Sequence, residues 1–349
     1  YIMKIAIIGA GFFGLTLGLF LSKKHQIHIY EKEKKILNGA SSANQFRFHL
    51  GYHYPRSQKT VNEIKKSKNL FISFFGKNIF GKTENFYLIA KKSKTNIKKY
   101  INFLLKNKLN YRHTELFKKN IFIEGAIKSN EKILNFFRIQ KIIFNKINKS
   151  NLDIKFKKEF EKEYLPKYDK VIVSTYSNNN KILTKLGIKK INDFEFQLVE
   201  KILVELPKKY KNKSYVVMDG KFVCIDPYLG TKYHLFSDVK LSKIEKRIGK
   251  FPAFSNKNKK YLNKGVVKNI KSSIYKKAIK RCSVYLPFLN KAKYVGSLYV
   301  VRAIKKNKSI TDERVTEIQN HSKKIMSIFS GKWNNCVSLA KKIDTNIGK

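Results

Sequence analysis

Residues 5–31 read IAIIGAGFFGLTLGLFLSKKHQIHIYE, and this stretch decides the fold. A short, largely apolar run over 4–8 begins it. Three glycines then follow at G-x-G-x-x-G spacing: Gly9, Gly11 and Gly14. In such a motif the first glycine permits a tight turn, the second lets a pyrophosphate approach the backbone, and the third lets helix and sheet pack closely. An apolar helical run over 15–21 and a second strand over 26–30 complete the order typical of a dinucleotide-binding βαβ unit.

The acidic residue Glu31 ends the second strand, 22 residues after Gly9. A carboxylate there can accept hydrogen bonds from both hydroxyls of an adenosine ribose, and it repels a 2′-phosphate, so NADP is the least favoured ligand. The motif alone does not separate FAD from NAD, but its place near the start of the chain favours FAD. The residues expected to contact the nucleotide here are Gly9, Gly11, Phe12, Phe13, Gly14, Glu31 and Lys32.

The composition fits a globular protein with room for two domains, at 349 residues with 42% hydrophobic and 13% aromatic content. No apolar run reaches the roughly 18 residues of a membrane span, and no signal peptide is visible, with Met3 the expected natural start. Cysteines stand far apart at 224, 282 and 336, so neither a disulfide framework nor a zinc site is expected. We expect no metal and a reducing, cytoplasmic location.

The formal net charge of +51 invites a nucleic-acid interpretation. The basic residues are nearly all lysine and are spread along the whole chain, whereas readers of bases and phosphates favour the arginine fork. A solvated basic surface is therefore favoured over a nucleic-acid partner. Because arginine is rare, each arginine inside a motif is a stronger candidate for a specific task.

A second informative stretch, residues 40–57, reads ASSANQFRFHLGYHYPRS. It is too polar for plain core, and its small hydroxyl residues suit a helix start that donates to a phosphate. Alternation over 45–50 predicts a strand with the apolar residues Phe46, Phe48 and Leu50 on one face. The polar residues Gln45, Arg47 and His49 are expected on the other face.

Together with the glycine motif, this stretch resembles the D-amino-acid oxidase superfamily of FAD-dependent oxidoreductases. It is most similar to the L-2-hydroxyglutarate dehydrogenase and glycine oxidase-like branches. The residues that match are Asn44, His49, Gly51, Tyr52, Tyr54, Pro55 and Ser57. The resemblance implies that Ser41, Ser42 and Asn44 lie near the flavin and that His49 and its neighbours lie near the isoalloxazine. Arg47 and Arg56 depart from the pattern of these branches.

The rest of the chain alternates between helical and strand patterns. Helices are expected over 58–75, 97–105 and 256–285, and a turn followed by a helix over 125–138. Strands are expected over 85–90, 139–144, 152–156, 169–176, 196–204, 215–241 and 294–302. The predicted fold is α/β, with a Rossmann-like FAD-binding domain interleaved with an antiparallel-sheet α+β substrate domain. The expected FAD-binding segments are 3–75, 126–195 and 290–349, and the substrate domain takes 76–125 and 196–289.

The end of the chain, residues 328–340, reads IFSGKWNNCVSLA and predicts a strand, a turn and a helix. It resembles the closing motif of the superfamily, in which a Gly-Lys opens the last helix against the flavin. The resemblance implies that Gly331, Lys332 and Trp333 contact the cofactor. Thr175, at the end of the strand over 169–176, is a further candidate, although small residues also cap ordinary strands.

These motifs predict an FAD-dependent oxidoreductase, oxidase or dehydrogenase, that takes a hydride from a CH–OH or CH–NH2 carbon of a small, anionic substrate, with an electron acceptor as second partner. Candidate bases are His49 and His53, and Arg302 is the first choice for gripping the anion. Expected substrate-binding residues are Arg47, Tyr52, Tyr54 and Arg56, and a structural ion pair is the alternative for each arginine. A flavoenzyme that modifies a sugar or nucleotide-sugar and a non-catalytic flavin-bearing nucleic-acid-binding protein stay open as alternatives.

Overall fold

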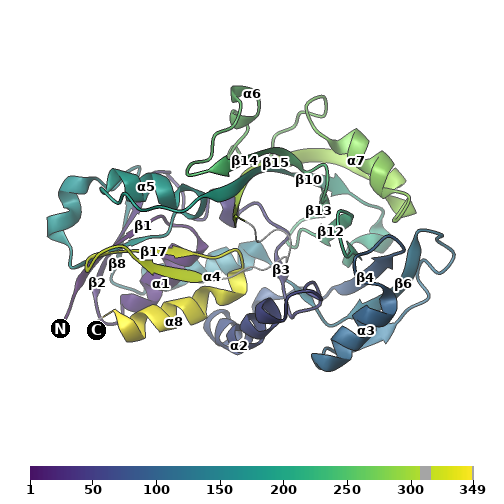
Figure 1. Cartoon of the computed structure of the whole chain (residues 1–349), viewed down its shortest axis with the longest axis horizontal. Helices are drawn as coiled ribbons and strands as arrows, with labels where there is room; N and C mark the ends of the chain where they lie inside the picture. The colour runs from purple at the N-terminus through teal and green to yellow at the C-terminus, as the bar shows by residue number, and fades with distance from the viewer. Residues whose placement is uncertain (307–315, 348–349) are drawn as a thin grey trace.

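The computed structural model describes residues 1–306 and 316–347 of the chain. Its smaller sheet has six strands in the order β16-β17-β9-β1-β2-β8, with the two neighbouring ends of the chain below it (Figure 1). All neighbours pair in parallel except β16 and β17. The bounds are β1 (Lys4–Ile8), β2 (Gln26–Glu31), β8 (Leu152–Phe156), β9 (Lys170–Val173), β16 (Glu317–Asn320) and β17 (Ile325–Phe329).

Helices flank this parallel sheet. The opening helix α1 packs against the last helix α8, which also contacts α2 (Figure 1). The buried side of α1 and α8 joins one apolar core with β1 and β2, because parallel strands are buried on both faces. The bounds are α1 (Phe12–Leu21), α2 (Gln58–Phe75), α4 (Phe136–Asn148), α5 (Asn179–Lys185) and α8 (Cys336–Asn346).

The larger sheet has nine strands in the order β14-β10-β13-β12-β11-β4-β6-β5, with β15 paired to β10. Its pairs are antiparallel except β11 with β4. The strand bounds are β4 (Glu84–Ala90), β5 (Tyr111–His113), β6 (Ile123–Ser129), β10 (Phe194–Glu205), β11 (Lys213–Met218), β12 (Val223–Pro227), β13 (Tyr233–Asp238), β14 (Lys243–Gly249) and β15 (Lys293–Lys305). Three helices, α3 (Ile97–Lys106), α6 (Asn256–Lys259) and α7 (Tyr275–Cys282), accompany it, and β3 (Arg47–Phe48) pairs with β7 (Lys132–Ile133).

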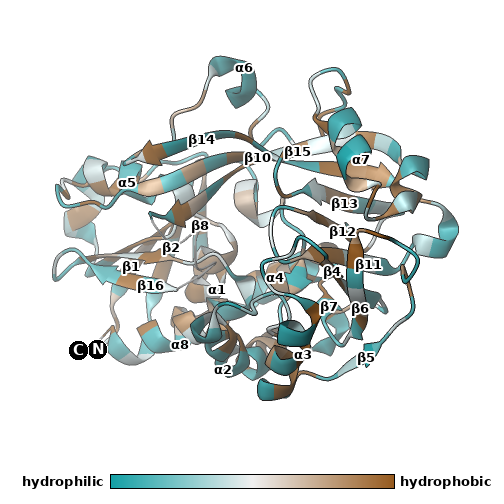
Figure 2. Ribbon diagram, turned by 45° about the vertical axis from the view of Figure 1, so that its right-hand side comes forward, coloured by the Kyte–Doolittle hydropathy of each residue, from teal (hydrophilic) through white to brown (hydrophobic). Residues whose placement is uncertain are grey.

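The two faces of the larger sheet have different partners. On β10, Ile202 and Val204 belong to a core with α7, whereas Val199 and Leu203 join the core that contains α1 and β1. Alternate residues of a strand point to opposite faces, so one face is covered by α7 and the other looks toward the parallel sheet. In Figure 2 the hydrophobic colour lies along the strands of both sheets, while α6 is hydrophilic.

The predicted fold class, two interleaved parts with one Rossmann-like sheet and one largely antiparallel sheet, is confirmed. The exact segment boundaries stay a prediction. Within the predicted third FAD-binding segment, β15 pairs with β10 in the larger sheet along its whole length.

Several predicted elements are wrong. Residues 139–144 lie in α4, not in a strand, because the buried Phe136, Ile139 and Ile143 follow helical spacing. Residues 125–129 belong to β6, and only α6 and α7 are helical within 256–285. The strand expected over 45–50 shrinks to two residues, since Phe46 has a φ of +50° and leaves extended geometry.

Candidate functional site

In the turn between β1 and α1, two glycines, Gly9 and Gly14, leave no room for a side chain. Gly9 has a φ of +105°, and a Cβ there would lie 2.8 Å from the carbonyl oxygen of Ser174. A Cβ on Gly14 would lie 2.0 Å from the carbonyl oxygen of Gly9, while one on Gly11 would lie 3.4 Å from Ser41 Oγ. The turn therefore has the close backbone approach that a pyrophosphate-binding loop needs.

The carboxylate of Glu31 lies directly beside this turn. Its Oε2 accepts a hydrogen bond of 2.8 Å from the backbone N–H of Ala10, and its Oε1 accepts one of 2.9 Å from Glu33. Burial raises the pKa of Glu31, while the two backbone hydrogen bonds oppose that shift. Lys32 is exposed and forms an ion pair of 3.8 Å with Glu33. Glu31 thus stands where a ribose would follow the phosphates, and Lys32 stands further out.

The segment after Glu31 returns to the start of α1. Ser41 Oγ accepts a hydrogen bond of 3.0 Å from the N–H of Phe12, and Ser42 Oγ donates one of 3.0 Å to Gly39. Thr175 lies on the other side of the turn, with its Cγ2 3.2 Å from the Cβ position of Gly9.

Two amide side chains of this segment behave differently. Asn44 is used locally, because its Oδ1 accepts a hydrogen bond of 2.7 Å from the N–H of Phe46. Both polar atoms of the neighbouring Gln45 amide are buried and have no hydrogen-bond partner. Buried amides in folded proteins are almost always hydrogen-bonded, so Gln45 is a candidate for contacting a ligand. The sequence placed Gln45 on the polar face of the expected strand but assigned it no role.

The closing motif meets the opening helix. The indole of Trp333 stacks on the ring of Phe12, with centroids 3.9 Å apart and an interplanar angle of 15°. Lys332 Nζ lies 4.1 Å from the ring centroid of Tyr54, and the Asn334 amide donates a hydrogen bond of 2.9 Å to the carbonyl oxygen of His49.

Burial, assisted by the charge of Arg47, lowers the pKa of Lys332 to about 7. Gly331, which directly precedes Lys332, is exposed. Phe13 is partly buried and packs against the core that contains Phe12.

The histidine stretch forms an aromatic group beneath the larger sheet. The rings of His49 and His53 lie 5.6 Å apart, and each lies 5.3 Å from the ring of Tyr54. Burial, with the nearby charges of His49 and Lys332, holds the pKa of His53 well below its usual range. Tyr52 is buried, and its hydroxyl donates to the carbonyl oxygen of Asn110 at 2.5 Å. His49, His53 and Tyr54 are thus brought together, and Tyr52 is engaged in the core.

Glu131 organises this group, although the sequence interpretation did not single it out. Its side chain is fully buried, with Oε1 3.3 Å from His49 Nδ1 and 2.9 Å from the N–H of Leu50. Tyr87 donates its hydroxyl to Oε2, and Arg47 Nη1 lies 3.6 Å from the same oxygen. No local motif marks Glu131, since its partners come from distant parts of the chain.

Arg47 is held by a carboxylate on β12, and Arg56 by one that directly follows β11. Arg47 is 6% exposed, forms an ion pair with Asp226 and donates 2.7 Å to Ser214. Arg56 engages both oxygens of Asp219, at 2.6 and 3.1 Å. The geometry favours the structural ion-pair alternative for both, and we do not propose them as substrate ligands.

Arg302 lies on β15 directly opposite Gln197 of β10. Residues directly opposite in an antiparallel pair share a face, and Gln197 shares its face with Val199. Arg302 therefore belongs to the face that looks toward the parallel sheet. Burial lowers the pKa of Lys201 and of Lys243, and the charge of Arg302 adds to that shift, so the three cations lie within electrostatic range of one another.

These observations fit a bound FAD. A glycine cradle lies at the carboxyl edge of the parallel sheet, where open α/β sheets bind their ligands, and the buried Gln45 amide has no hydrogen-bond partner. The closing motif and the histidines lie beyond the start of α1, toward the larger sheet. Among residues 1–306 and 316–347, no helix is long and apolar enough to cross a membrane, and no three His, Cys, Asp or Glu side chains gather as a metal site.

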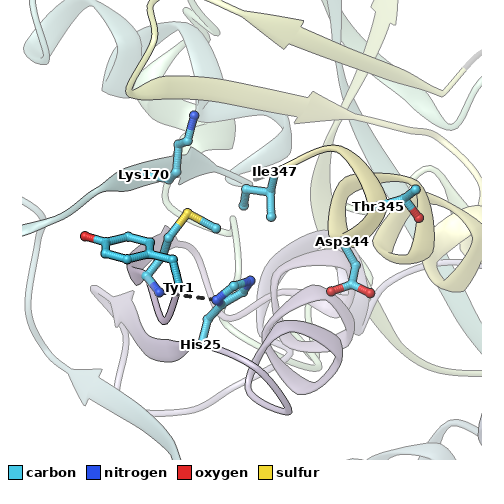
Figure 3. Close-up of a pocket in the computed structure, with 7 residues that line it drawn as sticks. Tyr1, His25, Lys170, Asp344, Thr345 and Ile347 are labelled. Atoms are coloured by element: carbon cyan, nitrogen blue, oxygen red, sulfur yellow. Dashed lines mark hydrogen bonds between the residues drawn. The ribbon is translucent and has the colours of Figure 1, made fainter. Parts of the chain in front are cut away.

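A separate cavity of about 420 Å³ lies at the opposite, amino edge of the parallel sheet. Figure 3 shows Tyr1, His25 and Asp344 around it, with His25 Nδ1 3.3 Å from the N–H of Met3. Parallel strands present their ligand sites at the carboxyl edge, so this cavity is not the functional site.

Comparisons with known proteins point to the same cofactor, FAD. The DAO family model, described as FAD dependent oxidoreductase, matches residues 4–119. The FAD-dependent monooxygenase kojA of Aspergillus flavus is 33% identical over 66 residues, which cover 19% of this chain and 15% of that protein. The FAD-dependent monooxygenase FPY4 of Fusarium mangiferae is 35% identical over 58 residues, 16% of each chain. The similarity to these curated relatives thus spans less than a fifth of their length.

Solved structures share the fold over nearly the whole chain. L-alpha-glycerophosphate oxidase from Mycoplasma pneumoniae, with FAD bound, has a TM-score of 0.71 at 12% identity and covers 100% of this chain and 95% of its own. Glycine oxidase from Geobacillus kaustophilus has a TM-score of 0.68 at 13% identity, with 99% and 94% covered.

A parallel sheet with a glycine turn, set against a large sheet with a polar inner face, defines a two-part flavoprotein of the oxidoreductase type. Residues 4–119 of the chain match the DAO family of FAD-dependent oxidoreductases, and nearly the whole chain shares the fold of solved proteins such as glycine oxidase. The predicted superfamily and the predicted FAD cofactor are confirmed at the level of that family. The closer similarity to one branch stays a prediction.

Proposed function

We propose that this protein oxidises a CH–OH or CH–NH2 carbon of a small, anionic substrate and passes the electrons to oxygen or another acceptor. The observation that carries the proposal is the polar inner face of the larger sheet, where His49 and Glu131 stand next to the closing motif. Among the fold neighbours, a glycine oxidase is named for an amine and a glycerophosphate oxidase for an alcohol, so both substrate types fit the fold.

Several residues of this chain would hold the cofactor. The glycine turn and the start of α1 would take the pyrophosphate, Glu31 the ribose, and Gln45, Lys332 and Trp333 the flavin end. When bound, FAD supplies the acceptor for the hydride that leaves the substrate carbon. The buried ammonium of Lys332 would stabilise negative charge on the reduced cofactor, since an anion close to it favours its charged form.

We propose His49 as the base that takes the substrate proton. The negative charge of Glu131, whose Oε1 lies 3.3 Å from Nδ1 of His49, favours the tautomer that carries the proton on Nδ1. Nε2 is then the proton acceptor. His53 is the weaker candidate, because its burial and cationic neighbours keep its pKa well below the usual value.

Arg302 remains the proposed ligand for the anionic group of the substrate. It lies on the same inner face as the buried network of Arg47 and Asp226, and Asp226 also acts on the pKa of Lys201 in that face. A guanidinium fork matches two oxygens of a carboxylate or phosphate.

Anaerobic titration of the FAD-loaded protein tests the proposal. We expect at least one compound from a panel of D- and L-amino acids, 2-hydroxy acids, glycerol phosphates and sugars to bleach the flavin absorbance. His49→Asn should slow that reduction by about 100-fold or more, the size of a general-base contribution. His113→Asn changes an exposed histidine of β5 and serves as the matched control. If no panel member reduces the flavin, or if both variants reduce at the wild-type rate, the proposal fails.

A further inference from the structure

Three basic side chains gather on the inner face of the larger sheet. Arg302 of β15 is directly opposite Gln197 of β10, and Lys243 of β14 is directly opposite Val199. Lys201 follows two residues after Val199 on the same strand, so it shares that face. The register thus places cations from three adjacent strands on the face that looks toward the parallel sheet.

Protein carboxylates do not neutralise the two lysines. Among the described residues, Lys201 forms no ion pair, and its Nζ contacts Ser237 Oγ at 3.2 Å. Lys243 likewise has no ion pair there, and Glu195 acts on it only from a longer range. The nearby Asp226 is held by Arg47. Burial, with the charge of Arg302 adding to it, lowers the pKa of both lysines to about 8.

A buried amide on the same face also has an unused polar atom. Gln197 is 2% exposed, its Nε2 donates 2.5 Å to Glu195, and its Oε1 is buried without a hydrogen-bond partner. Like-charged ammonium groups on a buried face destabilise the empty protein, and an orphaned amide oxygen adds to that cost. A bound anion that carries a hydroxyl would satisfy both.

We propose that Lys201, Lys243 and Gln197, with Arg302, form a subsite for the phosphate group of a phosphate-monoester substrate. This inference rests on the proposed function and names its substrate class. Lysine binds phosphate as a point charge, and two lysines without carboxylate partners match a dianion better than a single carboxylate, for which one arginine fork suffices.

The test uses the FAD-loaded protein, with inorganic phosphate as the probe and acetate as the monoanionic comparison, at constant ionic strength. Thermal unfolding and calorimetric titration report binding without any turnover. We expect phosphate to raise Tm and to bind more tightly than acetate. Lys201→Met and Lys243→Met should each weaken phosphate binding by about 10-fold to 100-fold, the effect of losing one hydrogen bond to a charged group. Lys293→Gln, at an exposed position of β15, is the matched control.

A second readout does not depend on the ligand. Without phosphate, Lys201→Met should keep or raise Tm, because it removes an unpaired buried charge. The subsite is refuted if phosphate does not bind, if acetate binds as tightly, or if the Lys201 and Lys243 variants bind phosphate like wild type. It is also refuted if phosphate binds only to protein stripped of FAD, because these cations would then belong to the cofactor site. Lysine-dependent phosphate binding without reduction by any panel compound would support the subsite and reject the proposed function. Reduction without phosphate binding would reject the subsite alone.

Discussion

The substitution Gly14→Ala tests the nucleotide turn most sharply. The new methyl group would lie 2.0 Å from the carbonyl oxygen of Gly9, while real Cβ atoms essentially never approach within 3.0 Å. The obstacle is backbone rather than a flexible side chain. Helix α1 must therefore move away from the turn by about 1 Å, the difference between these two distances.

The cost follows from this displacement. Overpacking of a tight interior contact costs about 1–3 kcal/mol of folding free energy, and occasionally more. Moving the first turn of α1 also lengthens its hydrogen bonds to the pyrophosphate, and losing one such bond to a charged group costs about 1.5–3 kcal/mol. We therefore expect FAD affinity to fall by about 10-fold to 100-fold.

The assay is a fluorescence titration of apoprotein with FAD, alongside urea unfolding of the same samples. Gly249→Ala is the matched control, because no atom lies within 4 Å of a Cβ at that position. It should leave both FAD affinity and stability unchanged. Wild-type affinity in Gly14→Ala would refute the account of the turn.

Three further predictions follow from the buried charges. Arg47→Met should lower the free energy of unfolding by about 3–5 kcal/mol, because Asp226 loses its partner in the interior, and urea melts should show no such loss for the exposed Arg112→Met. Glu131→Gln should slow anaerobic flavin reduction by about 10-fold to 100-fold, as for a group that orients another, and a wild-type rate in stopped flow would reject that role. Lys332 has a folded-state pKa lowered to about 7, so the unfolded chain binds one more proton above that pH. Stability of apoprotein should thus rise between about pH 7 and 10 more steeply than in Lys332→Met, by about 1.4 kcal/mol per pH unit, and equal slopes in urea melts would contradict this.

The candidate residues that could be named from the sequence are those that depend on local chemistry. Gly9, Gly14 and Glu31 could be named as candidates because a turn and a strand end impose residue types at fixed spacing. Ser41, expected at a helix start, instead ends a short 3-10 turn and accepts a hydrogen bond from the N–H of Phe12. The closing motif was found through resemblance to a family, and its stacking of Trp333 on Phe12 appears only in the structure.

The contacts that depend on strand register could not be predicted from the sequence. Arg47 meets Asp226 across 179 residues, so nothing local distinguished a substrate ligand from an ion pair. Lys201 and Lys243 looked like surface lysines in a chain of +51 formal charge. Only the pairing of β10 with β14 and β15 places them on the inner face beside Arg302.

The central claim is that one FAD lies between the glycine turn and the closing Gly-Lys motif. Equilibrium titration of purified apoprotein with FAD, followed by absorbance of the bound flavin, tests it directly. The account predicts a yellow protein that saturates at one FAD per chain, with binding weakened in both Gly14→Ala and Lys332→Met. A folded protein that binds no flavin at saturating FAD would contradict it. So would an FAD affinity that neither substitution changes.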